Sequence, residues 1–498
     1  MAHGIAAQAR NDFLPRLPAA NCQTAYFYQM GFNSLNFVFF LPIVFGLYWV
    51  LPHRWRWLFL LIASYAFYMS WNPWFGILLF GTTLVDWFVA LRMEKIAEQK
   101  KRKGWLLISL LSNLGCLAAF KYSAFFYNTF EWTRAEIAND IPHYMQALII
   151  PVGLSFYVFH SLSYTIDVYR GKITAEKNLG TFALFVSFFP QLVAGPIARF
   201  GDLGVQFHDQ KFLKSEMLIT GARLAIWGYF KKIAIADRLA DFVNPVFRHP
   251  DLYDGLTLLI IGFFFVVQVY CDFSGYSDIA TGIARMFGFE LKLNWRRPLL
   301  SKSLREFWQR NHISMTSWFR DYLYQSMGGS KVPYARWLFN LFAVFLISAL
   351  WHGANWTFVI WGAMHGIVYI IEVILKGKFR IPLLGWPYLI LFHTISLIAF
   401  RANSFHDLGI FYSKIFSFDW HASLAFTQLR TLNDLLPLVL GISGILFLFV
   451  KELSEERAWF TKLPKFENTW RPAFYTLLFV AIFVIGQFSA NEFIYFHF

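Results

Sequence analysis

Charged residues are scarce in this sequence. Asp, Glu, Lys and Arg make up 15% of the 498 residues, whereas hydrophobic types make up 57% and the mean hydropathy is +0.45. Domains that fold in water carry about a quarter charged residues. The deficit therefore excludes a water-soluble enzyme and predicts a protein that lies in a membrane.

Cysteine is rare as well, and several motifs of soluble catalysis are missing. Cys22, Cys116 and Cys271 are too few and too widely spaced for a disulfide framework or a thiolate metal site. The last two lie in apolar runs, which favours a packing role. The sequence has no G-x-x-x-x-G-K-[ST] loop, no H-E-x-x-H pair and no nucleophile elbow. ATP use, zinc hydrolysis and a serine acyl-enzyme are therefore not expected.

Apolar runs long enough to cross the ~30 Å hydrocarbon core of a bilayer recur along the chain. Some are short or interrupted by Pro and Gly, and such segments re-enter the membrane or lie in its interface. We therefore predict an all-α integral membrane protein with about eleven transmembrane helices. The runs begin near Phe32, Trp57, Trp74, Trp105, Met145, Phe182, Met217, Leu256, Trp337, Thr357, Trp386, Asp434 and Ala473.

The first 29 residues differ from the rest. They are polar and lack the short apolar stretch and cleavage site of a secretory signal. Met30 starts a run typical of a membrane protein, so we interpret 1–29 as a polar N-terminal extension and leave open whether it is native. Residues 30–498 are predicted to form a single multi-pass domain, because no segment between the apolar runs is long enough for a soluble domain.

The few charges are unbalanced, with 44 Lys and Arg against 30 Asp and Glu, a net charge of +14. The densest basic run covers residues 92–103. Short loops that stay in the cytoplasm hold most Lys and Arg, so we place this run inside. Counting back along the chain puts the N-terminus outside. The next loop, with Glu131, Glu136 and Asp140, is then external and acidic.

A first polar island, CDFSGYSDIATG, covers residues 271–282. Ionisable residues in a membrane are costly and need a reason, so Asp272 and Asp278, with Ser274 and Tyr276 between them, cannot face lipid. They either line a cavity, where a carboxylate pair suits acid/base work, or cap a helix and pair with a nearby Arg. The residues alone leave both interpretations open.

A second island, residues 304–331, is predicted to be an amphipathic helix rather than a span. Arg305, Trp308, His312 and Thr316 recur at intervals of three and four residues, which places them on one helical face. A Gly-Gly pair ends the segment in a turn. This pattern is consistent with a functional histidine and equally with a helix that lies on the membrane surface.

A third island, residues 348–366, places His352 beside Gly353 and near Asn355. An isolated histidine in a span is often a core residue. Here Gly353 leaves room for a substrate to approach the ring, and Asn355 has an amide that can hold an oxyanion.

Three further histidines are interpreted as structural. His365 follows His352 by 13 residues and, on a continuous helix, projects from a different face. His160 and His393 lie in apolar runs without polar neighbours, as core histidines do.

At these islands the sequence resembles the membrane-bound O-acyltransferase superfamily, and most closely the bacterial alginate O-acetyltransferase membrane subunits. The motifs DFSGYSDIATG, EFWQRNHIS, WFRDYLY and ALWHGANWTFVIWGAMHG stand in the family's order, with FPQLVAGPI and FNSLNFVFFLP before them. The resemblance covers nearly the whole chain after Met30. Asn311 stands where many relatives have an aromatic residue, and NWRRPLL at 294–300 replaces a more aromatic stretch, which leaves the acceptor open.

The resemblance implies a helical membrane fold around a central funnel, with a catalytic core over about residues 145–401. It implies His352 as catalytic histidine and His312 as the second histidine of the site. It implies acetyl-CoA as acyl donor substrate, a polysaccharide as final acceptor and an extracytoplasmic acyltransferase partner protein. The location it implies is the bacterial inner membrane. No permanently bound cofactor, no metal and no nucleic-acid partner are expected.

We expect His352 to act as general base on an acceptor hydroxyl, while His312 orients the thioester or protonates the leaving thiolate. An acyl-histidine intermediate is an alternative. Asn355 is a candidate for polarising the carbonyl, and Arg305 and Arg310 for holding the CoA phosphates. The predicted substrate-binding residues are Asn355, Arg305, Trp308, Arg310, Asp272, Ser274 and Tyr276.

Two other functions are consistent with the sequence. One is the transfer of D-alanine or another acyl group to a cell-envelope polymer. The other is a transporter or flippase without catalysis, although such folds often show inverted repeats and no internal repeat is visible here. The acceptor polymer stays open among alginate, another exopolysaccharide, cellulose and peptidoglycan.

Overall fold

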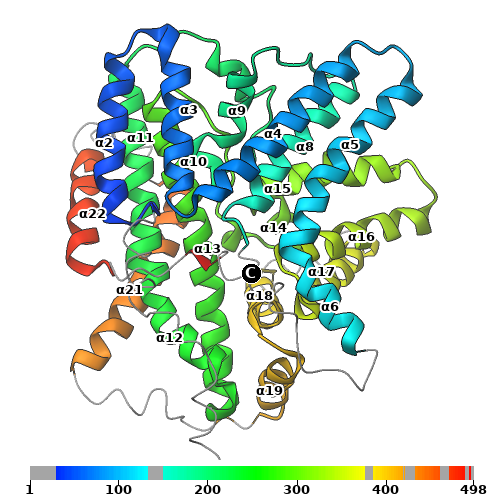
Figure 1. Ribbon diagram of the computed structural model, residues 1–498. Coiled ribbons are helices and arrows are strands. Elements are labelled where there is room, and N and C mark those ends of the chain that lie inside the picture. The colour runs from blue at the N-terminus through cyan, green and yellow to red at the C-terminus, as the bar shows by residue number, and fades with distance from the viewer. Residues whose placement is uncertain are drawn as a thin grey trace, which may run out of the picture.

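The computed structural model describes residues 30–132, 150–375, 385–418, 420, 432–459, 470–487 and 493–494. Within these ranges every regular element is a helix (Figure 1). The predicted extension 1–29 lies outside the described residues, as do Glu136 and Asp140 of the predicted acidic loop.

Four helices joined by short turns form the N-terminal part of the fold: α2 (Leu35–Val50), α3 (His53–Met69), α4 (Pro73–Glu94) and α5 (Gln99–Leu117). Ser34 and Asn72 cap helix starts, accepting hydrogen bonds from the backbone N–H groups of Phe37 and Trp74. A π-helical turn, η1 (Ala118–Tyr122), continues α5 into α6 (Ser123–Trp132). The α2–α3 and α4–α5 turns lie at the same end of the molecule (Figure 1).

The centre of the fold is built from helices that are buried on most sides. In α8 (Leu154–Tyr169) nearly every residue is buried, as expected for a helix without a polar face. The short helix α9 (Leu179–Ser187) packs beside it, and α10 (Phe189–Leu192) packs against α13 and α3; both are buried as well.

A long helix, α13 (Gly255–Met286), has 32 residues, or about 48 Å at 1.5 Å per residue. It packs against α11 (Ser215–Tyr229) through paired glycines. A Cβ added at Gly228 would lie 2.6 Å from the carbonyl oxygen of Gly275, and one at Gly221 would lie 2.6 Å from that of Gly282. Small residues let the two backbones approach, as is common between membrane helices.

The remaining helices surround the region where the predicted site residues meet. Between α11 and α13 the chain forms η3 (Phe230–Ala236) and α12 (Asp237–Arg248). After α13 come α14 (Leu304–Arg310), α15 (Ile313–Trp318), η6 (Phe319–Tyr324), α16 (Tyr334–His352), α17 (Trp356–Ile374), α18 (Gly385–Arg401), α19 (Phe405–Phe416), α21 (Leu432–Glu456) and α22 (Arg471–Ile485).

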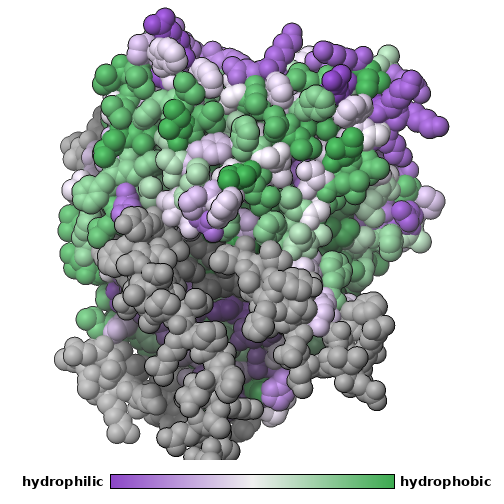
Figure 2. All heavy atoms as spheres, in the orientation of Figure 1, coloured by the Kyte–Doolittle hydropathy of each residue, from purple (hydrophilic) through white to green (hydrophobic). Residues whose placement is uncertain are grey.

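Six helices of the described residues are long and apolar enough to cross a bilayer, and α2 and α22 are shorter apolar helices. The six are Pro73–Glu94, Gln99–Tyr122, Gly255–Met286, Tyr334–His352, Trp356–Ile374 and Leu435–Glu456. Hydrophilic residues gather along the end that carries the α2–α3 and α4–α5 turns, and hydrophobic residues cover the band next to it (Figure 2). The protein is thus an all-helical, multi-pass membrane protein.

Candidate functional site

His312 lies at a break between two short helices. The prediction of one amphipathic helix over 304–331 is therefore wrong: α14 ends at Arg310 and α15 begins at Ile313. His312 has φ 45° and ψ 52°, in the left-handed region. A residue with a Cβ adopts this conformation at a cost of about 1–2 kcal/mol, and such strain clusters at functional sites.

Asn294 holds the strained segment in place. Its backbone oxygen accepts from Ile313 N at 2.8 Å, and its side-chain oxygen accepts from Ser314 N at 3.1 Å and from Ser314 Oγ at 2.8 Å. The Asn294 amide donates to Ser277 Oγ on α13 at 3.1 Å. The sequence did not predict a role for Asn294. Its only signal was its position in NWRRPLL, the stretch that departs from the family pattern.

His352 is the last residue of α16, and a second break follows it. Asn355 caps the start of α17, accepting from Thr357 N at 3.2 Å, and its amide donates to Asn403 O at 3.2 Å. The room expected beside Gly353 is filled, because a Cβ added there would lie 2.1 Å from the ring of Phe358.

The two predicted histidines line the same small cavity, which we call the histidine chamber. Its volume is about 70 Å³, and His365, His393, Trp308 and Trp361 also line it. The assumption that placed His365 on another face than His352 is wrong, because the helix breaks at residues 353–355 and α17 folds back. Four histidines from four segments of the chain therefore meet in one chamber.

Aromatic rings fill the spaces between these histidines. The Trp351 ring lies 6.4 Å from the ring of His312 and 4.9 Å from that of His352, measured between centroids. Trp361 lies 5.3 Å from His352 and 4.9 Å from His365. These large rings fix the imidazoles by packing and leave little free volume around them.

The chamber histidines differ in their hydrogen bonds. Nδ1 of His393 donates to Leu389 O at 2.7 Å, and Nε2 of His365 lies 3.2 Å from Ser396 Oγ. Neither ring nitrogen of His312 bonds to another described residue, although its side chain is only 2% exposed. Buried polar groups are almost always hydrogen-bonded, so His312 is available to a group that enters the chamber.

A much larger cavity, which we call the outer cavity, adjoins the chamber. It measures about 1750 Å³ and lies between α14, α15, η6, α16 and α17. Trp308 and Met315 line both cavities and form their common wall. A large ligand in the outer cavity is therefore separated from the chamber histidines only by the side chains of this wall.

Cations outnumber carboxylates along the outer cavity. Its charged lining residues are Lys302, Arg305, Arg320 and Glu372. The Glu372 carboxylate accepts from the N–H groups of Leu304 and Arg305, at 2.8 and 3.1 Å, and thereby caps α14. With three cations against one carboxylate, the lining of the outer cavity has a net positive charge.

Asp321 lies beside this lining and stays ionised. Burial raises the pKa of its carboxyl, but hydrogen bonds and charge from Arg320 and Arg199 outweigh burial and hold the pKa below its ordinary value of 3.8.

Residues 74–405, which include all four chamber histidines, match the model of the membrane-bound O-acyltransferase family. The chain belongs to this family. It is therefore a membrane acyltransferase. It is 37% identical over 436 residues to the probable alginate O-acetylase AlgI of Pseudomonas syringae pv. tomato, covering 86% of this chain and 83% of that one.

Two more distant relatives of this O-acyltransferase carry other names. The peptidoglycan O-acetyltransferase of Helicobacter pylori is 31% identical over 75% of this chain and 77% of its own length. The teichoic acid D-alanyltransferase of Bacillus subtilis is 26% identical, over 47% of this chain and 61% of its own.

Of the predicted binding residues of the O-acyltransferase, Trp308 and Arg305 line a cavity. The others lie outside both cavities: Arg310, Asn355, Asp272, Ser274 and Tyr276. Arg310 pairs with Glu306 at 2.6 Å and with Glu456 at 2.9 Å. Asn355 is the helix cap described above. Of the cationic residues proposed for the donor, Arg305 alone lines the outer cavity.

In this O-acyltransferase the motif DFSGYSD faces a buried lysine pair. Its carboxylates pair with cations, as one interpretation expected, but they do not cap a helix, because both lie inside α13, whose N-cap is Asp254. Lys232 of η3 lies 2.6 Å from Asp272, and Lys231 lies 2.7 Å from Asp278 and 2.8 Å from Ser274 Oγ. The partners are Lys rather than the expected Arg. We call this group the buried ion cluster.

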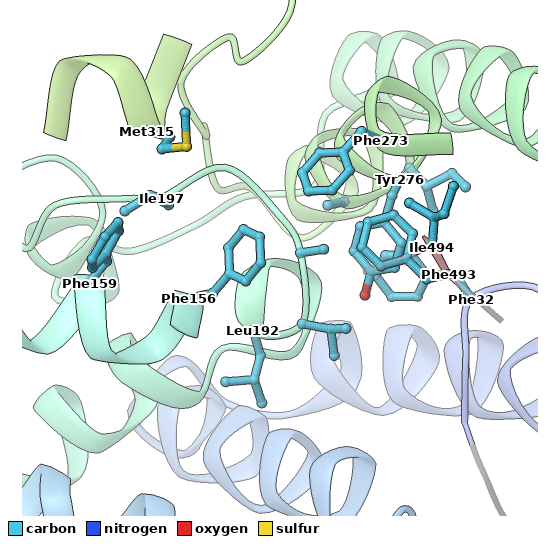
Figure 3. Close-up of a cluster of buried hydrophobic side chains, with 14 of the residues drawn as sticks. Phe32, Phe156, Phe159, Leu192, Ile197, Phe273, Tyr276, Met315, Phe493 and Ile494 are labelled. Atoms are coloured by element: carbon cyan, nitrogen blue, oxygen red, sulfur yellow. The ribbon is translucent and has the colours of Figure 1, made fainter. Parts of the chain in front are cut away.

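Tyr276 packs in an aromatic cluster on the same helix. Its ring stacks on Phe32 at 4.4 Å and lies 5.0 Å from Phe493 (Figure 3). Neither cavity is lined by Asp272, Ser274 or Tyr276.

His160 lies in α8 against Phe185 and lines neither cavity. The described residues contain no group of three or more His, Cys, Asp or Glu side chains that could hold a metal ion.

Proposed function

We propose that this acyltransferase passes an acetyl group from cytoplasmic acetyl-CoA, its acyl donor substrate, to an extracytoplasmic polysaccharide, with His352 as general base. The observation that carries the proposal is the joining of a small histidine chamber to a large cationic cavity through one shared wall. A small acyl group and a large anionic carrier need two such spaces.

The size of the chamber supports an acetyl group. One water-sized group needs roughly 10–15 Å³ of such volume, so about 70 Å³ holds roughly five of them. An acetyl group and its thioester sulfur fit in this space, whereas a long acyl chain does not.

His352 takes the proton of the acceptor hydroxyl while the hydroxyl oxygen attacks the thioester carbon. The new carbon–oxygen bond forms, the carbon–sulfur bond breaks, and the proton passes from the imidazole to the departing thiolate. His312, whose ring nitrogens have no partner among the described residues, orients the thioester or delivers the proton to sulfur. An acyl-histidine formed first and then attacked by the acceptor is the alternative sequence of steps.

The donor enters from the end of the molecule that carries the basic α4–α5 turn. Arg102 donates to Val168 O at 2.7 Å, and Arg170 donates to Asp321 O at 2.8 Å, which ties this turn to η6 beside the outer cavity. Arg305 and Arg320 then bind the CoA phosphates by charge-assisted hydrogen bonds.

The acceptor is proposed from the relatives' names. The more similar relatives are named alginate O-acetylase, and they match most of this chain, whereas the D-alanyltransferases match less than half of it. An alginate-like polysaccharide is therefore the preferred acceptor. A separate extracytoplasmic acyltransferase completes the transfer to the polymer.

We propose a bacterial inner-membrane location, about eleven spans and an N-terminus outside. Residues 30–498 form the single multi-pass domain, with the catalytic core over about 145–401.

The test uses the full chain in proteoliposomes with acetyl-CoA, an acceptor oligosaccharide and the separate extracytoplasmic acyltransferase. Release of the CoA thiol and acetylation of the product are measured for His352→Ala and His312→Ala, with the exposed His406→Ala as control. We expect both chamber variants to lose about 10²- to 10⁴-fold in rate and the control to keep it.

If His352→Ala and His312→Ala fold and keep the wild-type rate, the assignment of the two histidines is wrong. Activity with a D-alanyl carrier protein but not with acetyl-CoA favours the D-alanyl alternative.

A further inference from the structure

The end of α16, which carries His352, lies in the protein interior. An α-helix leaves its last four carbonyl groups without partners in the helix, and a buried end must find donors elsewhere. In α16 these are the carbonyls of Ala349, Leu350, Trp351 and His352.

Each of the four carbonyls accepts a hydrogen bond. Gly353 N donates to Ala349 O at 3.2 Å. The other donors come from a distant part of the chain: Tyr122 Oη donates to Leu350 O at 2.8 Å, and Lys121 Nζ donates to Trp351 O at 2.7 Å and to His352 O at 3.0 Å. Two consecutive side chains of η1 therefore cap the helix that presents His352.

The backbone of η1 is unusual where these donors lie. Ala118–Tyr122 forms a π-helical turn between α5 and α6. Such a turn displaces the side chains that follow it around the helix axis, and π-turns occur often at functional sites. The turn lets neighbouring residues reach the same helix end.

Lys121 is a buried cation without a carboxylate partner among the described residues. Its side chain is 7% exposed, and its contacts there are the two carbonyls and the Trp351 ring, whose centroid lies 6.0 Å from Nζ. The partial negative charge of a helix C-terminus favours a cation at this place. Burying an ammonium in a membrane protein is costly and indicates a specific role.

We propose that Lys121 is a positioning residue that fixes the backbone of His352 and so aims its imidazole into the histidine chamber. The inference rests on the proposed function of His352 as the base. Without the ammonium, the last two carbonyls of α16 lack their donor, the final turn frays and the imidazole loses its fixed place. Lys121 itself does not touch the substrates.

The test replaces the ammonium and measures kcat and KM separately. Lys121→Met keeps the length of the side chain without a donor, Lys121→Gln keeps a neutral donor, and Lys121→Arg keeps a cationic one. We expect Lys121→Met to lower kcat about 10- to 100-fold, since a misplacement of about 1 Å costs a catalytic group that much. KM for acetyl-CoA should stay within about twofold, because the outer cavity is unchanged.

Two controls on α5 separate positioning from general stability. Lys103→Met removes an exposed lysine and should keep wild-type kinetics. Asn113→Ala breaks a buried contact in which the Asn113 amide donates to Asp86 at 2.8 and 3.0 Å, so it lowers the unfolding temperature without touching α16. Loss of stability with little loss of kcat is expected for Asn113→Ala.

Partial recovery of kcat in Lys121→Arg, with Lys121→Gln intermediate, supports the proposal. Wild-type kcat in folded Lys121→Met overturns the proposal. The proposal is also overturned if Lys121→Met and Asn113→Ala lose the same stability and the same kcat. If Lys121→Met does not fold, Lys121→Gln is compared with Lys121→Arg by the same criterion. Full activity of His352→Ala would instead refute the proposed function.

Discussion

Two residues other than the histidines shape the chamber. Asn294 joins the strained backbone at His312 to Ser277 on α13, and so couples the DFSGYSD motif to the site. Trp308 lines both cavities and forms part of the wall between them. We therefore expect Asn294 to position His312 and Trp308 to select the acyl group.

Asn294→Ala removes the amide that bonds Ser314 and Ser277. We expect kcat to fall about 10- to 100-fold, because His312 loses its fixed conformation. The matched control is Asn340→Ala, since Asn340 is equally buried and donates to Met327 O and Gly329 O away from the chamber. An equal loss of kcat in both variants at equal stability would contradict the positioning role of Asn294.

Trp308→Ala opens the wall between the two cavities. We expect the ratio of kcat/KM for butyryl-CoA to that for acetyl-CoA to rise at least about tenfold, since a hydrophobic pocket discriminates about 1–3 kcal/mol per methylene. Trp337→Ala, which changes only the outer cavity, should leave this ratio unchanged. A ratio that moves equally in both variants, or in neither, argues against Trp308 as the selector.

At the scale of elements, α13 packs against the α11–η3 segment, and this contact holds α13 in place beside the site. Glycine pairs allow the close approach of the two helices, and the buried ion cluster fixes their register. Lys232 also lies 2.8 Å from Asp237, so one buried ammonium contacts two carboxylates. Removing one member of such a buried group leaves uncompensated charge.

Lys232→Met is therefore expected to destabilise the protein by about 3–5 kcal/mol, the range for breaking a buried ion pair. The measurement is thermal unfolding in detergent, compared with Lys292→Met. Lys292 pairs with Asp202 at 2.5 Å, but its side chain is 65% exposed, so its removal should cost little. Similar unfolding temperatures for the two variants would show that the cluster is not a stabilising element.

At the scale of the whole molecule, one end carries the basic α4–α5 turn together with the α2–α3 turn (Figure 1). The end of α13 lies near the end of α2, since the ring of Phe287, just after α13, is 5.2 Å from that of Tyr48. The α12–α13 loop lies at the opposite end of the molecule (Figure 1). The proposed function requires the basic end to lie inside, so that a cytoplasmic donor can reach the outer cavity.

Cysteine labelling tests this orientation. In a chain whose natural cysteines are replaced, Lys101→Cys and Asp251→Cys place exposed thiols at the two ends. A membrane-impermeant maleimide should label Asp251→Cys in spheroplasts and Lys101→Cys only after permeabilisation. The opposite pattern would invert the orientation and with it the proposed side of the donor.

The sequence alone determined the class of the protein. It also predicted the basic cytoplasmic loop, and its resemblance to the family selected His312 and His352 as candidates. Hydropathy and charge are properties of the chain itself, and histidine islands in apolar runs are visible without any contact. Composition also predicted that DFSGYSD avoids lipid, which its pairing with Lys231 and Lys232 confirms.

Only the tertiary structure decided how these residues meet. The breaks at His312 and at 353–355 follow from long-range contacts such as those of Asn294 and Lys121, which local periodicity does not contain. His365 and His393 joined the chamber for the same reason. Lys121 caps a carbonyl 231 residues away, because a buried helix end must be satisfied by whichever donor the fold brings to it.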